Sequence, residues 1–293
     1  MFGPFVANSG SEVNVSGGSV GDGVVQTGGF NGQSGSVLNL SGGNVFGPIG
    51  ISGEMNMSGG TVTGDFFFAN PGSMVNISGG TVSAGFFLSD ASEVNISGGT
   101  VLHSLDPSSG SVLNINGGTV NGVVAREGSE VNMSGGALDG IGALSGSQVT
   151  ISGGAVGGIL NAFSGSDVEL IGGDFELNGA AVSESTISFE RDDVFTGALT
   201  DGSAFFITSS TALDVTLTLA DIPPLDLTPM VVSTAEPNFP SGLRPGQTLT
   251  ILSGGELGDN FDLIEATLNV EGCLLYTSPS PRDATLSRMP SSA

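Results

Sequence analysis

The chain has 293 residues, of which 50 are glycine, 29 are acidic and only five are basic, so its formal net charge is −24 at pH 7. Such a charge excludes nucleic acid and anionic membrane surfaces as expected partners. No apolar run is long enough to span a bilayer. A hydrophobic fraction of 38% argues against a disordered chain.

A short motif recurs from residue 9 to about residue 179, and residues 92–101 (SEVNISGGTV) show it in full. Its Gly-Gly pairs lie at 17–18, 42–43, 59–60, 79–80, 98–99, 117–118, 135–136, 153–154 and 172–173. The steps between successive pairs are 25, 17, 20, 19, 19, 18, 18 and 19 residues. A short, nearly fixed period is typical of a solenoid, in which each repeat forms one coil. The long first step leaves open a degenerate extra turn around Gly28-Gly29.

Aligned copies of the motif show apolar columns on either side of a polar one. The first apolar column is Val13, Leu38, Met55, Val75, Val94, Leu113, Val131, Val149 and Val168. The second is Val15, Leu40, Met57, Ile77, Ile96, Ile115, Met133, Ile151 and Leu170. Between them stand Asn14, Asn39, Asn56, Asn76, Asn95, Asn114 and Asn132, followed by Thr150 and Glu169. This alternation is typical of a strand with one buried face.

The Gly-Gly pair is expected to form a corner, because glycine tolerates crowded and left-handed backbone conformations. Another apolar column follows it, running from Val20 to Phe175, and then a looser apolar patch, as at residues 66–68, 86–88 and 123–124. We therefore predict an all-β fold: a parallel β-helix of about nine turns of about 19 residues with three strands per coil. Parallel crossovers favour a right-handed solenoid. Strand spacing gives a rod on the order of 40 Å long.

Acidic residues occupy every second copy of the column that precedes the first apolar position. That column reads Glu12, Val37, Glu54, Met74, Glu93, Val112, Glu130, Gln148 and Asp167. Stacked in register, adjacent carboxylates would repel each other. A two-turn duplication unit is one explanation of the alternation, and electrostatic spacing is compatible with it.

Beyond the array, the period is lost but strand character remains. Residues 186–189, 194–199 and 204–207 read as strands, and Thr200-Asp201-Gly202-Ser203 reads as the hairpin turn between the last two. A proline-rich connection follows, and the motif returns near Leu249. We expect an array over 1–182, a non-repeat β segment with its connection over 183–246, and a resumed partial solenoid over 247–272.

The two ends of the chain lead to separate expectations. Residues 1–5 show no signal peptide, and the echo of Phe2-Gly3-Pro4 in Phe46-Gly47-Pro48 predicts that the sequence starts inside a repeat. Residues 273–293 resemble a translated sequencing adaptor and hold the only Cys and the only Tyr. We interpret them as a non-native tail that follows a repeat cut off near Gly272.

The repeat unit at 92–101 resembles repeats of large secreted bacterial proteins with parallel β-helix passengers, including autotransporter-like and PEP-CTERM-sorted surface proteins. Residues 193–203 resemble the non-repeating β segment that follows such arrays. The resemblance covers most of residues 1–272. It implies an extracellular or cell-surface scaffold with a structural or adhesive role, without naming a chemistry.

Few residues are candidates for catalysis. His103 is the only histidine and falls in a variable loop, so we interpret it as incidental. Glu169, Asp174 and Glu176, with residues 191–193, gather near the end of the array. They support the alternative of a polysaccharide-degrading β-helix enzyme, of the lyase or glycoside hydrolase type, with carboxylates near residues 167–193, because β-helix hydrolases use paired carboxylates on adjacent turns. No His/Cys set with metal spacing and no phosphate loop is present, so the sequence predicts no catalytic, cofactor or metal residues.

Residue types bear on three binding alternatives. Weak scattered calcium binding is compatible with the acidity, but the β-roll calcium pattern is absent. The Asn-x-Ser triplets match a glycosylation acceptor but recur with the strand, so we interpret them as structural. The single Thr row is a poor match for ice, and residues 1–272 lack the Trp or Tyr that carbohydrate sites favour. Extracellular polysaccharide and other surface proteins remain the expected partners of a scaffold, and the oligomeric state is not predicted.

Overall fold

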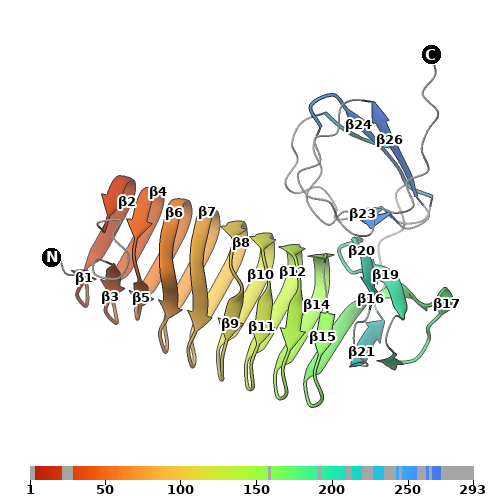
Figure 1. Ribbon diagram of the computed structural model, residues 1–293, viewed down its shortest axis with the longest axis horizontal. Helices are drawn as coiled ribbons and strands as arrows, with labels where there is room; N and C mark the ends of the chain where they lie inside the picture. The colour runs from red at the N-terminus through yellow and green to blue at the C-terminus, as the bar shows by residue number, and fades with distance from the viewer. Residues whose placement is uncertain are drawn as a thin grey trace.

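The computed structural model describes residues 4–21, 29–157, 160–190, 193–208, 213–219, 227–233, 242–243, 246–255, 262–263 and 266–271. In these ranges the protein is all-β, and stacked coils form a rod (Figure 1). No helix of the described residues is long and apolar enough to cross a membrane. The predicted tail at residues 273–293 lies outside the described ranges.

Each coil of the rod contributes one long strand, and consecutive long strands pair in parallel. The long strands are β2 (Glu12–Val20), β4 (Val37–Phe46), β6 (Glu54–Ala69), β7 (Met74–Leu88), β8 (Glu93–Val101), β10 (Val112–Val120), β12 (Glu130–Leu138), β14 (Gln148–Val156) and β16 (Asp167–Leu177). Their register matches the predicted columns: Val94 pairs with Leu113, and Asn95 with Asn114. The predicted parallel β-helix with a spacing of about 19 residues is confirmed.

A short strand completes most coils. These strands are β1 (Phe5–Ala7), β3 (Phe30–Gly32), β5 (Ile49–Ile51), β9 (Leu105–Pro107), β11 (Val123–Ala125), β13 (Ile141–Ala143) and β15 (Leu160–Ala162). In β6 and β7 the corresponding residues continue the long strand. The first and third residues of each short strand point inward, except at Phe5 in the first coil. The core is therefore lined by five columns that run from coil to coil, three from the long strands and two from the short strands.

The sequence left open an extra turn around Gly28-Gly29; residues 22–28 lie outside the described ranges, and the strands on either side of them are adjacent. β2 pairs directly with β4, with Val13 opposite Leu38, so no coil lies between them. The described chain resumes at Gly29, and Phe30 donates its backbone N–H to the carbonyl of Pro48 in the next coil at 3.1 Å. Register is fixed by the apolar columns rather than by the number of residues in the connection.

The Gly-Gly corner needs both glycines, as Gly98 and Gly99 show. A Cβ on Gly98 would lie 2.5 Å from the backbone oxygen of Ser78 in the preceding coil. Gly99 has a φ of +80°, and a Cβ there would lie 2.8 Å from the oxygen of Gly80. The long strand continues through the corner because the backbones of adjacent coils approach closely there, which only glycine permits.

A second corner, which the sequence analysis missed, has the form x-x-Gly-Ser. In residues 108–111 the N–H of Ser111 donates to the carbonyl of Ser108 at 2.9 Å, and Gly110 has a φ of +72°. The Ser111 hydroxyl is buried and donates to the same carbonyl at 2.6 Å. Comparable hydroxyl bonds occur at Ser36, Ser92, Ser129, Ser147 and Ser166. All of these serines except Ser166 are buried, so they satisfy the turn from inside the coil.

The non-repeat segment closes the far end of the core. It contains β17 (Ala180–Ala181), β18 (Thr186–Phe189), β19 (Val194–Leu199), β20 (Ala204–Thr208) and β21 (Leu213–Leu219). β19 runs antiparallel to β16, and β21 runs parallel to it. The ring of Phe195 is fully buried, with its centroid 5.2 Å from that of Phe175 in the last coil. The predicted hairpin turn over residues 200–203 is present between β19 and β20.

A second, shorter parallel stack follows. It comprises β22 (Met230–Val232), β23 (Gly242–Leu243), β24 (Thr248–Leu252), β25 (Asp262–Leu263) and β26 (Thr267–Glu271). Met230 pairs with Leu249, and Leu249 pairs with Leu268, so the step is again 19 residues. Pairing thus begins at Met230, inside the stretch that the sequence assigned to the connection. Its small core holds Val232, Leu243, Leu249 and Ile251.

Candidate functional site

The structure places the three predicted carboxylates of the array, Glu169, Asp174 and Glu176, on the single strand β16. Glu169 lies half-buried on β16 between Thr150 and Thr216. Asp174 and Glu176 are exposed, further along the same strand. Within the described residues, no group of three His, Cys, Asp or Glu side chains is placed to hold a metal ion. Arg191 and Asp192 lie outside the described ranges, and His103 is exposed in a loop.

Asp193 has a structural arrangement instead. Its Oδ1 accepts a 2.8 Å hydrogen bond from Nδ2 of Asn178, and its Oδ2 accepts a 2.7 Å bond from the N–H of Glu190. These two donors, the Asn178 side chain first, hold the pKa of Asp193 below its usual value of 3.8. Asn178 also accepts the N–H of Val194 at 3.0 Å. Asp193 therefore ties the hairpin after β16 to the start of β19.

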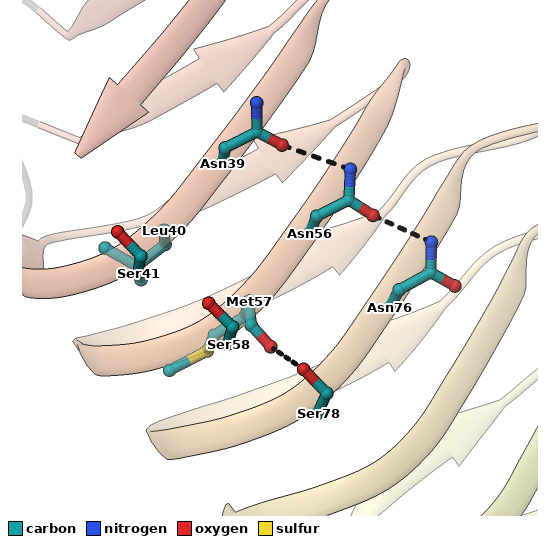
Figure 2. Close-up of a pocket in the computed structure, with 8 residues that line it drawn as sticks. All are labelled: Asn39, Leu40, Ser41, Asn56, Met57, Ser58, Asn76 and Ser78. Atoms are coloured by element: carbon teal, nitrogen blue, oxygen red, sulfur yellow. Dashed lines mark hydrogen bonds between the residues drawn. The ribbon is translucent and has the colours of Figure 1, made fainter. Parts of the chain in front are cut away.

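The asparagine column forms a continuous hydrogen-bonded ladder along one outer face, and Figure 2 shows three of its members. Each Nδ2 donates to Oδ1 of the asparagine in the preceding coil, at 2.8–3.1 Å, from Asn39 back to Asn14 and onward through Asn132. The amides are half-buried from Asn39 onward. A ladder of this kind stabilises the coil register, since each amide is both donor and acceptor.

The alternating acids belong to this ladder. Glu54 accepts the Nδ2 of Asn56 at 2.8 Å, Glu93 that of Asn95 at 3.0 Å and Glu130 that of Asn132 at 2.8 Å. In the column itself Glu54, Met74 and Glu93 stand opposite one another in successive coils. The expected doubling of carboxylate spacing is thus present, and each acid in addition receives the second amide proton of its own coil.

A shallow hollow of about 180 Å³ lies between the asparagine column and the serines two residues further along the strand (Figure 2). It spans three coils and is lined by Asn39, Leu40, Ser41, Asn56, Met57, Ser58, Asn76 and Ser78. Ser78 Oγ donates to the carbonyl of Met57 at 3.3 Å across it. A second hollow of about 260 Å³ lies at the Gly-Ser turns around Ser129. Neither is lined by Glu169, Asp174 or Glu176.

Three phenylalanines point outward on the third side of the coils, a feature that sequence reasoning missed. Phe67 and Phe86 are fully buried, whereas Phe66 and Phe68 are 46% and 38% exposed. Phe87 is half-buried on the next coil. We call Phe66, Phe68 and Phe87 the aromatic platform. The alternation of side chains along a strand is the signal that could predict it, because the residues on either side of a buried one point outward.

The rings of the aromatic platform contact each other across two coils. The centroids of Phe68 and Phe87 are 5.5 Å apart with the rings near parallel, and Phe66 lies 5.9 Å from Phe68 and 6.0 Å from Phe87. Gly85 lies beneath Phe66 and Phe87, because a Cβ there would be 3.4 Å from Phe87 Cε2 and 3.9 Å from Phe66 Cδ1.

A polar pair flanks the platform in the following coil. Phe87 stands opposite Asp106 in the register, and Asp106 forms an ion pair with Arg126 at 3.0 Å. The Arg126 side chain is 50% exposed and that of Asp106 is 19% exposed. The face thus presents apolar rings beside one carboxylate and one guanidinium.

No protein-family model, curated protein or solved structure matches this chain significantly. The fold is therefore the structural basis for any functional conclusion.

Proposed function

We propose that this chain is a structural or adhesive repeat scaffold, a stalk or spacer exposed outside the cell or on its surface, with no catalytic activity of its own. The observation that carries the proposal is the unbroken register from β2 to β16, closed by β19 to β21. Such an array buries one continuous core and offers repeated lateral faces, as solenoid scaffolds do.

Further support comes from the use of polar side chains. The asparagines bond to one another, the glutamates bond to asparagines, and the turn serines bond to backbone carbonyls. The asparagine bonds join adjacent coils, whereas the glutamate and serine bonds order the strand and the turn within one coil. The strong negative charge suits a protein that stays soluble and apart from its copies.

Surface location is tested by labelling intact and lysed cells of the source organism with antibodies against the purified chain. We expect labelling of intact cells. Labelling only after lysis would contradict the extracellular assignment. Extracellular polysaccharides and other cell-surface proteins are the partners that such a location provides.

Absence of catalysis is tested separately with soluble pectin, xylan, β-glucan and alginate, by release of reducing ends and by the ultraviolet absorbance of unsaturated ends. No release is expected. Release that disappears in Glu169→Gln or Glu176→Gln would establish the polysaccharide-degrading alternative, whereas release that persists in both would indicate a contaminant.

A further inference from the structure

We propose that copies of this chain assemble head to tail, with strand β26 of one copy added to the exposed edge of strand β2 in the next copy. The inference goes beyond the scaffold function, because it gives the rod a partner, a second copy of the same chain. Within the described residues, β2 pairs only with β4 and β26 pairs only with β24, so each strand has one open edge. An open strand edge is a template for another strand.

The open face of the first coil, at the free end of the rod, is the face that a preceding coil covers elsewhere in the array (Figure 1). Val13 is the one residue of the first apolar column that is not fully buried, and Asn14 is exposed. Phe5 and Val6 of β1 are 47% and 46% exposed. The later coils therefore show what fits this face, namely a parallel strand with apolar residues on either side of an asparagine.

Gly17 indicates the same kind of occupant. At the equivalent position of the following coils, from Gly42 to Gly153, an added Cβ would lie 2.4–2.7 Å from a backbone oxygen of the preceding coil. No atom lies within 4 Å of a Cβ added to Gly17. Glycine at this position is needed only where another backbone approaches it closely, as at the other corners.

Strand β26 carries the pattern that the open face requires. Its Leu-Asn-Val run at residues 268–270 repeats the apolar, asparagine, apolar order of residues 13–15. In the parallel register of the array, Asn269 of one copy stands opposite Asn14 of the next. Asn14 Nδ2 donates to Glu12 at 3.2 Å and has a second proton for the Asn269 oxygen, so the asparagine ladder continues across the contact. The short strand β25 precedes β26 as β1 precedes β2.

The same register keeps carboxylates apart. Glu12 stands opposite Thr267, just as each acid of the array stands opposite non-acidic neighbours. Glu271 stands opposite Gly17, with the one-residue offset that the array shows at its corners. The net charge of −24 opposes contact along the sides of two rods. A contact at the ends brings only one coil of each copy together, and salt screens the remaining repulsion.

The contact joins two different surfaces, so it does not close on itself. Each added copy leaves one β2 edge and one β26 edge free, and assembly continues as a linear series. Two copies that met through their β2 edges would instead form a closed dimer of antiparallel strands.

The proposal is tested by sedimentation velocity of the full chain over a wide range of protein concentration, in low and in high salt. We expect species larger than a dimer that grow with concentration and with salt. Gly17→Ala should weaken association about tenfold or more, because its Cβ would meet the Glu271 carbonyl of the added strand. Val270→Lys should do the same from the other side, since Val270 is 40% exposed on β26 and would lie opposite Val15.

Mixing the two variants gives the sharpest readout. Each has one intact edge, so the mixture should form dimers and nothing larger, while each variant alone stays monomeric. The matched controls are Gly142→Ala, where an added Cβ also meets no atom within 4 Å, and Val231→Lys, at a 58% exposed valine of the same stack on β22. Both controls should associate as the unmodified chain does, and circular dichroism melts establish that all four variants fold.

Three results would overturn the proposal: a chain that stays monomeric in every condition, a closed dimer without larger species, or association that neither Gly17→Ala nor Val270→Lys weakens. Surface labelling and the activity assay do not depend on assembly, so the scaffold function is judged separately.

Discussion

Asp201 Oδ2 accepts a 2.7 Å hydrogen bond from the backbone N–H of Gly154, which belongs to a coil 47 residues earlier. Its Oδ1 accepts the N–H of Ser203 at 2.9 Å and is also bonded by the Ser203 hydroxyl. Thr200 donates both its N–H and its hydroxyl to the carbonyl of Ser152. The hairpin turn over residues 200–203 thus packs on the Gly153-Gly154 corner. Elsewhere in the array, the Gly-Gly corner of the next coil packs at this position.

Removing the carboxylate of that turn should loosen the cap. Asp201→Ala leaves the buried N–H of Gly154 without its acceptor, so we expect a loss of about 1–3 kcal/mol in the free energy of unfolding. Asp201→Asn keeps one acceptor oxygen and should cost less. Urea denaturation and amide exchange at Gly154 measure the effect. Asp90→Ala, at an exposed aspartate in a coil turn, is the control, and equal losses in both alanine variants would contradict this reading of the cap.

Substitution at the Gly-Gly corner should depend on whether a coil precedes it. Gly98→Ala forces a Cβ against the Ser78 carbonyl at 2.5 Å, and the strain should cost about 1–3 kcal/mol. Gly17 occupies the same motif position in the first described coil, and no atom lies within 4 Å of its added Cβ. Gly17→Ala should therefore be nearly neutral. Thermal and urea melts of the two variants distinguish them, and similar destabilisation would refute the close-approach argument.

Two buried serines at the same position of successive turns differ in their hydrogen bonding. Ser92 is 1% exposed and donates to the Ser89 carbonyl at 2.6 Å, so Ser92→Ala should lose about 1 kcal/mol. Ser73 is buried in the same column, but its Oγ has no hydrogen-bond partner within the described structure. Ser73→Ala removes an unsatisfied buried hydroxyl and should be neutral or stabilising. Chemical denaturation of both variants measures the two changes in stability. A larger loss in Ser73→Ala than in Ser92→Ala would contradict the prediction.

Replacing the amide of one asparagine by a carboxylate should break the asparagine ladder, because a carboxylate accepts hydrogen bonds but donates none. Asn95 donates to Asn76 and to Glu93, and accepts from Asn114. In Asn95→Asp an anion faces the Glu93 carboxylate, so we expect more destabilisation than in Asn95→Ala, by about 1 kcal/mol. Lowering the pH should restore part of the stability of the Asp variant. Asn121→Asp, in an exposed loop, is the control, and both pH profiles come from urea melts.

The hydrogen bonds of Asp193 should make the stability of the cap depend on pH. Its pKa is lowered in the folded state by Asn178 and then by the Glu190 N–H, so its contribution is complete above the unfolded value of about 3.8. That contribution is lost as the pH falls through the lower folded pKa. An NMR titration of Asp193 should give a midpoint below 3.8, and Asn178→Ala should raise it. An unchanged midpoint in the variant would show that Asn178 does not stabilise the carboxylate.

The coil register could be predicted because it repeats. Apolar residues on either side of each asparagine can be buried on one face only if copies stack, and the columns from Val13 to Val168 then follow. The hairpin turn at residues 200–203 was also predictable from local turn chemistry. These features depend on neighbours in sequence or on a period that the sequence displays.

The features that the sequence did not reveal depend on the direction in which a side chain points, or on contacts between residues far apart in the chain. Phe66 and Phe68 flank the buried Phe67, and a register shift between Thr63 and Phe66 decides which rings point outward. The contact of Asp201 with Gly154 joins the non-repeating segment to the array, so the repeat period does not predict it. The second stack starts at Met230, within a proline-rich stretch whose composition is typical of a connection.

The asparagine ladder also gives the rod a dipole along its axis. Backbone dipoles in a sheet largely cancel, but every amide from Asn39 to Asn132 donates toward the preceding coil. Their dipoles add along the axis, as peptide dipoles do in an α-helix, with the positive end toward the N-terminus. Two such rods lying side by side would favour opposite orientations, so the ladder favours antiparallel over parallel lateral association.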